Sequence, residues 1–384
     1  MKYFFFLNMF SKRTLINLLR YFIFMAVVIG IISAALFTYI PAEEVKKTII
    51  YAARDLTTPS TDIITIYPMS SNITTFSVSN KNQVYSSEYI WTYDKQTYSY
   101  KIEIPQELYE YYSNRNHDRY DYEQYAVSDY DREIIQKLAK SFADHGRRNK
   151  HSEEQIAANV IAFTHSIPYL TDIETTGFDE YPRYPVETLI DGGDCEDLAI
   201  LAVAILYELN QECILVRLEN HMGIGLKDSG NYTGISYLYN ETVYYYAGVT
   251  EGETAVGIIP KSIDPTLKEL YYVQPMPKVS GHLVQHVSGF DEKSYRYSLR
   301  GNIENEGSGI GKNVTVRIET KLNNKSGEPI PDTLIPIGNI PEDYNADIEV
   351  SFSVPRSSGI VDIWIEGDNF DSFEVTGFHF SFGK

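Results

Sequence analysis

The sequence Asp191-Gly-Gly-Asp-Cys-Glu-Asp197 runs directly into the apolar segment Leu198-Ala-Ile-Leu-Ala-Val-Ala-Ile-Leu206. This pattern predicts a glycine-rich turn followed by a buried helix that begins at Cys195. Exposed backbone N–H groups at a helix N-terminus favour negative charge, so they favour a thiolate over a thiol. Cys195 is therefore a candidate nucleophile, and its own backbone N–H is the expected oxyanion donor.

A nucleophilic cysteine needs a base, and His221 is the candidate. It follows the apolar strand pattern Ile214–Leu218. A cysteine at a helix start with a histidine on a strand is typical of one kind of cysteine hydrolase. The alternative for each residue is a structural role, as a buried thiol and as a core histidine with satisfied hydrogen bonds.

The acids around Cys195 have simpler expected roles. Asp194 is expected to be the N-cap of the helix, with a catalytic acid as the alternative. Glu196 and Asp197 lie in the first turn, where the helix dipole stabilises acids, although their charge opposes thiolate formation. Arg183 and Glu180 are expected to fix the preceding loop, with substrate contact as the alternative.

Composition excludes several function classes. The 384 residues carry a formal net charge of −19, which argues against a nucleic-acid partner. No phosphate-binding loop, dinucleotide fingerprint or zinc-protease motif is present, so no cofactor is expected. His282 and His286 have i,i+4 spacing but lack a third ligand, so no metal site is expected. Cys213 is expected to be a core residue rather than a disulfide partner, because a helix about 20 Å long separates it from Cys195.

The N-terminal segment has the features of a membrane anchor. Tyr21 to Ile40 is an uncharged run long enough to span a bilayer as a helix. Basic residues precede it, which predicts a cytoplasmic N-terminus and extracytoplasmic domains. A cleaved signal peptide, ending near Ser33-Ala-Ala35, is the alternative. Glycosylation sequons after the anchor agree with an outside location, and they occur at Asn72, Asn231, Asn240, Asn313 and Asn324.

Periodicity and turn residues suggest a division into segments. We expect a helix from Asp131 to Asp144 and another from Ser152 to His165, the latter with Ser152 and Gln155 as a capping box. The expected organisation is a cytoplasmic N-terminus (1–20), an anchor (21–40), a β-rich extracytoplasmic region (43–130), a core (131–267), a linker (268–287) and an immunoglobulin-like β-sandwich (288–384).

Four motifs occur in an order that is characteristic of one protein family. They are Phe178-Asp-Glu-Tyr-Pro-Arg-Tyr-Pro-Val-Glu-Thr-Leu189, the Cys195 motif, Asn220-His-Met-Gly-Ile-Gly225, and Tyr244-Tyr-Tyr-Ala247 followed by Val256-Gly-Ile-Ile-Pro260. The segment from about Tyr89 to Thr266 thereby resembles the transglutaminase-like superfamily, specifically its membrane-anchored archaeal-type members. The resemblance covers a little under half the chain.

The resemblance implies a fold and a catalytic pair. The implied fold class is α+β, with a papain-like core that has the cysteine on a helix N-terminus and the histidine on an antiparallel sheet. The N-terminal transmembrane helix and the C-terminal β-sandwich would flank this core. By matching position, Cys195 would be the nucleophile and His221 the base that takes its proton.

The sequence departs from the family pattern at the third catalytic position. An Asp or Glu on the next strand would orient the histidine, and that position falls on Gly248. Glu251 is a candidate replacement if the loop shifts, and Thr250 or a backbone carbonyl would orient His221 more weakly. The remaining alternative is an impaired site on a fold kept for binding.

Two functions follow from these residues. The first is thiol-dependent amide-bond hydrolysis or acyl transfer through Cys195 and His221, acting on a protein or peptide substrate. The second is a catalytically inactive cell-surface binding or scaffold protein, as the glycine at position 248 suggests.

Overall fold

The computed structural model describes residues 65–66, 83–117, 120–250, 255–323 and 330–381. The expected cytoplasmic N-terminus and anchor (1–40), Glu251, and the sequons at Asn72 and Asn324 lie outside these ranges. Within them, no helix is both long and apolar enough to cross a membrane.

The predicted fold class is wrong. Strands hold 43% of the described residues and helices 23%, so this part of the chain is mostly β, and it contains no helix of the kind that a transmembrane segment requires. The difference arises because the C-terminal strands are long and follow one another with no helix between them. Within the described ranges, the helices lie between residues 106 and 208.

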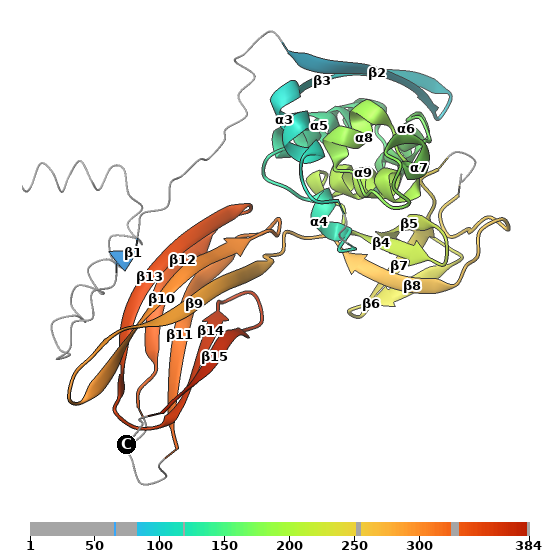
Figure 1. Ribbon diagram of the computed structural model, residues 1–384. Coiled ribbons are helices and arrows are strands. Elements are labelled where there is room, and N and C mark those ends of the chain that lie inside the picture. Colours follow the sequence, from blue (N-terminus) through green and yellow to red (C-terminus); the bar gives the residue numbers. More distant parts are fainter. Residues whose placement is uncertain (1–64, 67–82, 118–119, 251–254, 324–329, 382–384) are drawn as a thin grey trace, which may run out of the picture. The chain divides into compact units, whose positions relative to one another are not determined.

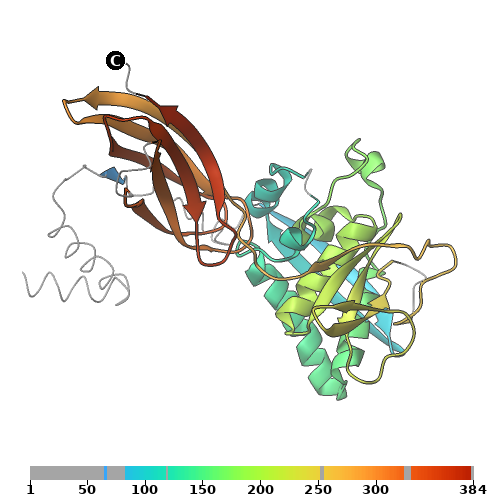
Figure 2. The ribbon, with the colours of Figure 1, turned by 90° about the horizontal axis from the view of Figure 1, so that it is seen from below.

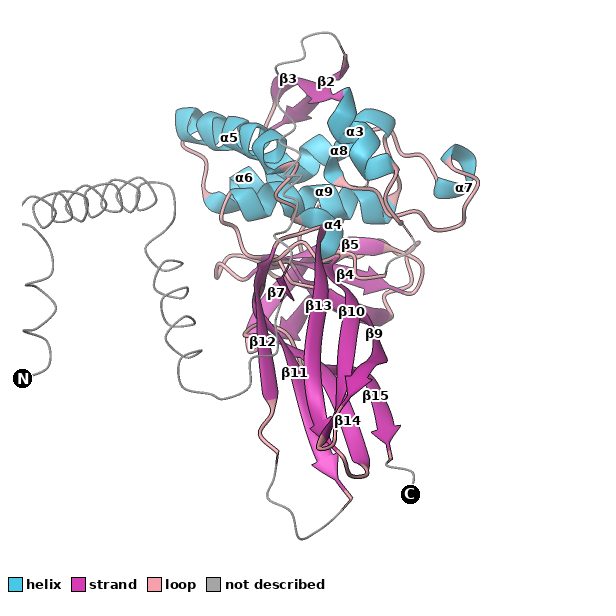
Figure 3. Cartoon of the chain, turned by 60° about the vertical axis from the view of Figure 1, so that its left-hand side comes forward, coloured by secondary structure: helices cyan, strands magenta, loops and turns pink. Residues whose placement is uncertain are grey.

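The helices pack around one apolar member, α9 (Cys195–Glu208). Its residues from Leu198 to Leu206 are at most 1% exposed. An apolar surface on all sides predicts burial on all sides, and α9 contacts α4, α5, α6 and α8 as well as the neighbouring strands. The other helices are α3 (Gln106–Ser113), α4 (Glu123–Ala126), α5 (Arg132–Asn149), α6 (Glu153–Thr164), α7 (Asp172–Thr175) and α8 (Pro185–Asp191) (Figure 3).

The two helices expected from periodicity are present. The expected helix from Asp131 continues as α5 to Asn149, where Lys150 adopts a left-handed conformation and ends it. The capping box of α6 is confirmed: Gln155 N–H donates to Ser152 Oγ at 3.3 Å, and Ser152 N–H donates to Gln155 Oε1 at 2.9 Å.

A five-stranded antiparallel sheet lies against the helices. Its order is β6-β7-β5-β4-β8. The strands are β4 (Cys213–Leu218), β5 (Met222–Lys227), β6 (Ser236–Tyr239), β7 (Thr242–Ala247) and β8 (Leu267–Tyr272). Gly223 on β5 is needed for close packing, because a Cβ there would lie 2.7 Å from the ring of Tyr246. α9 contacts β4 and β5 of this sheet.

A hairpin covers the other side of the helices, so the core has three layers (Figure 1). The hairpin consists of β2 (Val84–Tyr93) and β3 (Gln96–Pro105). Trp91 Nε1 donates to Asn159 Oδ1 on α6 at 2.8 Å, and Tyr89 OH donates to the carbonyl of Leu189 on α8 at 2.5 Å. Both bonds are buried, and they fix the hairpin to two helices.

The C-terminal strands form two four-stranded sheets with a separate apolar core (Figure 2). The sheet orders are β1-β13-β10-β9 and β12-β11-β14-β15. The residues expected to form a linker, 268–287, contain most of β8 and the first part of β9. The strands are β1 (Thr65–Ile66), β9 (Val279–Phe290), β10 (Ser294–Asn305), β11 (Gly311–Leu322), β12 (Thr333–Ile340), β13 (Tyr344–Pro355), β14 (Gly359–Glu366) and β15 (Phe373–Phe380).

The substitution Asn159→Ala tests how the hairpin is held. It leaves the buried indole N–H of Trp91 without its acceptor, so the free energy of unfolding should fall by about 1–3 kcal/mol. Ser99→Ala, at an exposed position of β3, should change it by less than about 0.5 kcal/mol. Urea denaturation measures both. Equal effects would mean that the Trp91 bond does not hold the hairpin.

Candidate active site around Cys195

The turn before α9 is fixed by glycine geometry and backbone hydrogen bonds. Gly192 has a φ of +80°, and a Cβ on it would lie 2.5 Å from the carbonyl oxygen of Pro168. Gly193 N–H donates to that same carbonyl at 3.2 Å, and Leu170 N–H donates to the Gly193 carbonyl at 3.0 Å. A Cβ on Gly193 would collide with the Asp197 side chain. The two glycines therefore let the chain enter α9 at Cys195.

A buried ion network holds the first turn of α9. Arg183 Nη1 contacts Asp172 Oδ1 at 2.6 Å and Asp197 Oδ2 at 2.5 Å, and these three side chains are at most 3% exposed. The backbone N–H of Arg183 donates to Asp197 Oδ1 at 2.6 Å. Asp197 Oδ2 also accepts the N–H of Asp194, the N-cap residue, at 3.2 Å. We call Arg183, Asp172 and Asp197 the arginine network.

The expected roles of Arg183 and Glu180 as loop anchors are confirmed. Arg183 Nη2 donates to Thr175 Oγ1 on α7 at 2.6 Å, so one guanidinium joins α7, the loop and α9. Glu180 Oε1 accepts the hydroxyl of Tyr122 at 2.5 Å. The proline-rich loop is thus tied at two points directly before the Cys195 turn.

The sulfur of Cys195 lies at the start of β5. The backbone N–H of Met222 hydrogen-bonds to it, and Met222 directly follows His221 in the chain. The backbone around the histidine is fixed as well, because the His221 carbonyl accepts the N–H of Leu218 at 2.8 Å. The Cys195 thiol therefore lies beside Met222, the residue that follows His221 in the chain.

The surroundings of Cys195 oppose the ionisation of its thiol. Burial raises the pKa of Cys195 well above its ordinary value, and the charges of Glu196 and Asp194 raise it further. The Met222 N–H acts in the opposite direction. Cys195 Sγ donates to Glu196 Oε2 at 3.2 Å. The helix N-terminus favours a thiolate, but burial and two acids act against it.

Glu196 shares this environment. It is 7% exposed, and burial together with a hydrogen bond to Asp194 raises the pKa of Glu196 to about 10. The sulfur of Cys195 and one carboxylate oxygen each of Asp194 and Glu196 lie within 4.8 Å of one another. Three acidic groups so close in a buried site disfavour one another's ionisation, and Glu196 is the one whose pKa is raised above neutral pH.

Two groups of described residues have the spacing of metal ligands. One is the cluster of Asp194, Cys195 and Glu196. The other group consists of Asp172, Asp194 and Asp197. There the Arg183 guanidinium already supplies a positive charge to Asp172 and Asp197. His282 and His286 lie on β9 with exposed side chains, paired opposite Asn302 and Ser298 of β10.

The third catalytic position has no side chain. Gly248 directly follows Ala247, the last residue of β7, which pairs with Ile224 on β5. Val249, the next residue, is fixed through its carbonyl, which accepts the Thr164 hydroxyl at 3.0 Å. The backbone here is well held and carries no carboxylate at position 248.

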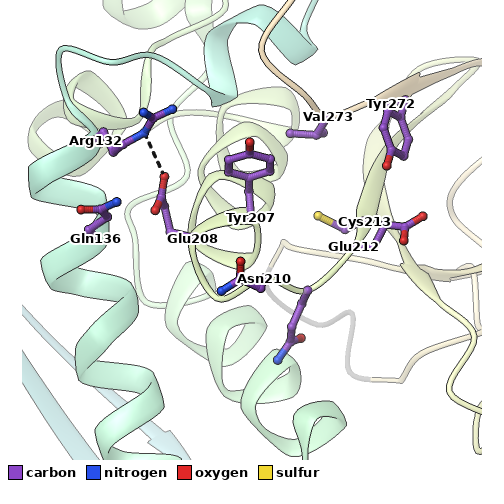
Figure 4. A pocket seen from close by; sticks show the side chains of 10 residues that line it. Arg132, Gln136, Tyr207, Glu208, Asn210, Glu212, Cys213, Tyr272 and Val273 are labelled. Atoms are coloured by element: carbon purple, nitrogen blue, oxygen red, sulfur yellow. Dashed lines mark ion pairs between the residues drawn. The ribbon is translucent and has the colours of Figure 1, made fainter. Parts of the chain in front are cut away.

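A separate pocket lies at the far end of α9 (Figure 4). It has a volume of about 490 Å³ and includes Tyr207 and Glu208, whereas Cys195 is the first residue of that helix. A helix of fourteen residues spans about 20 Å, so this pocket is not part of the Cys195 site. Cys213 lines it with a buried side chain, and both cysteines are free thiols as predicted.

Sequence reasoning missed two buried residues behind the site, His117 and Glu187. His117 is 6% exposed and Glu187 is 2% exposed. Glu187 is the N3 residue of the α8 capping box, but its contact with His117 joins parts of the chain that are far apart in sequence. The nearest signal is the pair of prolines around Arg183, which indicates a rigid loop but does not identify what holds it.

Comparison with protein-family models gave no match, and comparison with curated proteins gave none either. The transglutaminase-like resemblance therefore rests on the motifs quoted above.

Replacing Arg183 tests the arginine network. Arg183→Met leaves Asp172 and Asp197 buried without a counter-charge, so it should lower the free energy of unfolding by about 3–5 kcal/mol. Arg147→Met, at a side chain that is 76% exposed, should change it by less than about 0.5 kcal/mol. Denaturant titration distinguishes the two. Similar losses for both variants would contradict the role given to Arg183.

The ionisation of Cys195 is the second test. Alkylation by iodoacetamide, followed at the Cys195 peptide by mass spectrometry, should have a midpoint above the value of about 8.5 for a free cysteine. Asp194→Asn removes a neighbouring charge and should move this midpoint to lower pH. Asp179→Asn, an exposed acid of the preceding loop, should not. A wild-type midpoint at or below 8.5 would overturn the account of a protonated thiol.

Proposed function

We propose that this chain is a transglutaminase-like protein in which Cys195 attacks an amide carbonyl of a protein or peptide substrate. The observation that carries the proposal is the hydrogen bond from Met222 N–H to the Cys195 sulfur, next to His221. This nearness supports the proposal because nucleophilic catalysis requires a base close to the thiol, and His221 directly precedes β5.

The chemistry follows from these positions. His221 accepts the thiol proton as the sulfur attacks, and an S–C bond forms at the carbonyl carbon. The tetrahedral oxygen is stabilised by the backbone N–H of Cys195 at the start of α9. The C–N bond then breaks, His221 returns the proton to the leaving amine, and a thioester remains. Water releases it as an acid, whereas an amine releases it as a new amide.

The protonated resting thiol sets the pH dependence. The pKa of Cys195 is raised by burial and by Glu196 and Asp194, so the thiolate fraction is small at neutral pH. It grows as the pH rises towards that pKa. Acylation should therefore accelerate with increasing pH.

A second candidate function is binding without catalysis. Gly248 and the protonated thiol favour it, because both remove features that a cysteine hydrolase uses. In a related triad, loss of the orienting carboxylate costs about four orders of magnitude in rate. A scaffold protein would need neither an ionised Cys195 nor an oriented His221.

Acylation by p-nitrophenyl acetate separates the two functions. The proposal predicts p-nitrophenolate release with an acetyl group on Cys195, and no such adduct in Cys195→Ser. His221→Ala should slow acylation at least tenfold. Gly248→Asp, which restores a carboxylate, should speed it relative to the uncharged control Gly248→Asn.

One combination of results would contradict the proposed catalysis. If His221→Ala is acylated as fast as the wild type, and Gly248→Asp as slowly as Gly248→Asn, Cys195 and His221 do not act together. The binding function would then replace the catalytic one.

A further inference from the structure

His117 is a buried histidine whose two ring nitrogens both face backbone carbonyls. Nδ1 lies 2.7 Å from the carbonyl oxygen of Pro182, and Nε2 lies 3.1 Å from that of Tyr112. The ring also stacks on Tyr181 with centroids 3.9 Å apart and an interplanar angle of 11°. Its position is therefore defined by the end of α3 on one side and the proline-rich loop on the other.

The two carbonyls restrict the protonation state of this ring. A neutral imidazole has one N–H, whereas a backbone carbonyl can only accept. In either neutral tautomer one nitrogen lone pair would face a carbonyl oxygen at hydrogen-bond distance. The imidazolium form donates from both nitrogens and satisfies both carbonyls.

A counter-charge is available beside the ring. Glu187 Oε1 lies 3.7 Å from His117 Nε2, and Glu187 Oε2 accepts the N–H of Tyr184 at 2.9 Å. The distance of 3.7 Å is an ion-pair distance and too long for a hydrogen bond from a protonated Glu187 to the ring. The geometry fits a carboxylate beside an imidazolium.

Burial acts against this ionised pair. It lowers the pKa of His117 and raises that of Glu187 to about 8. The charges of Arg183 and Arg115 also lower the pKa of His117, and Asp197 and Asp191 raise that of Glu187. Considered alone, these effects would leave the proton on Glu187. Both carbonyls act in the opposite direction, because their hydrogen bonds to the ring raise the pKa of His117. A proton on Glu187 would leave a lone pair of His117 facing a carbonyl oxygen at hydrogen-bond distance, without a donor between them.

We infer that His117 and Glu187 form a buried imidazolium–carboxylate pair, and that His117 is a positioning residue for the Cys195 site. The Pro182 carbonyl that His117 holds belongs to the same peptide group as the Arg183 N–H, which donates to Asp197 Oδ1 at 2.6 Å. This peptide group is thus fixed at both ends, and hydrogen bonds in such a chain polarise one another. Asp197 lies two residues after Cys195, so His117 helps to set where α9 begins. Its effect on Cys195 chemistry rests on the proposed function.

Side-chain ¹⁵N NMR of the full chain labelled at histidine tests the pair directly. The His117 signals are assigned by their loss in His117→Gln. At pH 7 both His117 nitrogens should show the protonated pattern. Glu187→Gln keeps the bond to Tyr184 but removes the charge, so it should lower the protonation midpoint of His117 by about one pH unit or more. Glu174→Gln, an exposed acid of α7, should leave it unchanged. A single protonated nitrogen at pH 7 would overturn the inference.

The positioning role has a separate readout. The pH profile of Cys195 alkylation in Glu187→Gln should gain an inflection at the pH where NMR shows His117 losing its proton, and Glu174→Gln should gain none. An imidazolium without this inflection would overturn the positioning role. The NMR result does not depend on catalysis, so failure of the acylation experiment would leave the ion pair standing.

Discussion

The arrangement around Cys195 depends on the buried guanidinium of Arg183. It contacts Asp172 at the start of α7 and Asp197 in the first turn of α9, and its own N–H bonds to Asp197 again. Burying three charges is costly unless each is paired with good geometry. That requirement fixes the distance between α7, the loop and α9, and so fixes where the cysteine lies.

The same network explains why the thiol is not activated by its position alone. The glycine turn and Asp197 bring Asp194 and Glu196 close to the sulfur, and the N-terminal dipole of α9 is too weak to offset them. A helix terminus is worth only about half a charge. Any catalysis by Cys195 therefore depends on His221 as a base, and position 248 has no side chain to orient that base.

Local patterns predicted the local features well. The start of α9 follows from a glycine turn before a long apolar run, and the α6 cap follows from Ser152 and Gln155. Periodicity could not reveal the fold class, because strand content depends on how far each C-terminal strand continues through its pairing. It also could not reveal that Asp197 is buried rather than a surface acid. The roles of His117 and Glu187 could not be read from the sequence, because they depend on contacts between distant parts of the chain. His117 and Pro182, for example, are 65 residues apart.

Hydrogen exchange in Arg183→Lys, followed by mass spectrometry, tests most directly whether the arginine network holds the site. Lysine keeps the charge but cannot contact Asp172, Asp197 and Thr175 together. The account predicts faster exchange in peptides covering residues 181–198 and in the Met222 amide, with β13 of the sandwich unchanged. Unchanged exchange in residues 181–198, or an equal increase in β13, would contradict it.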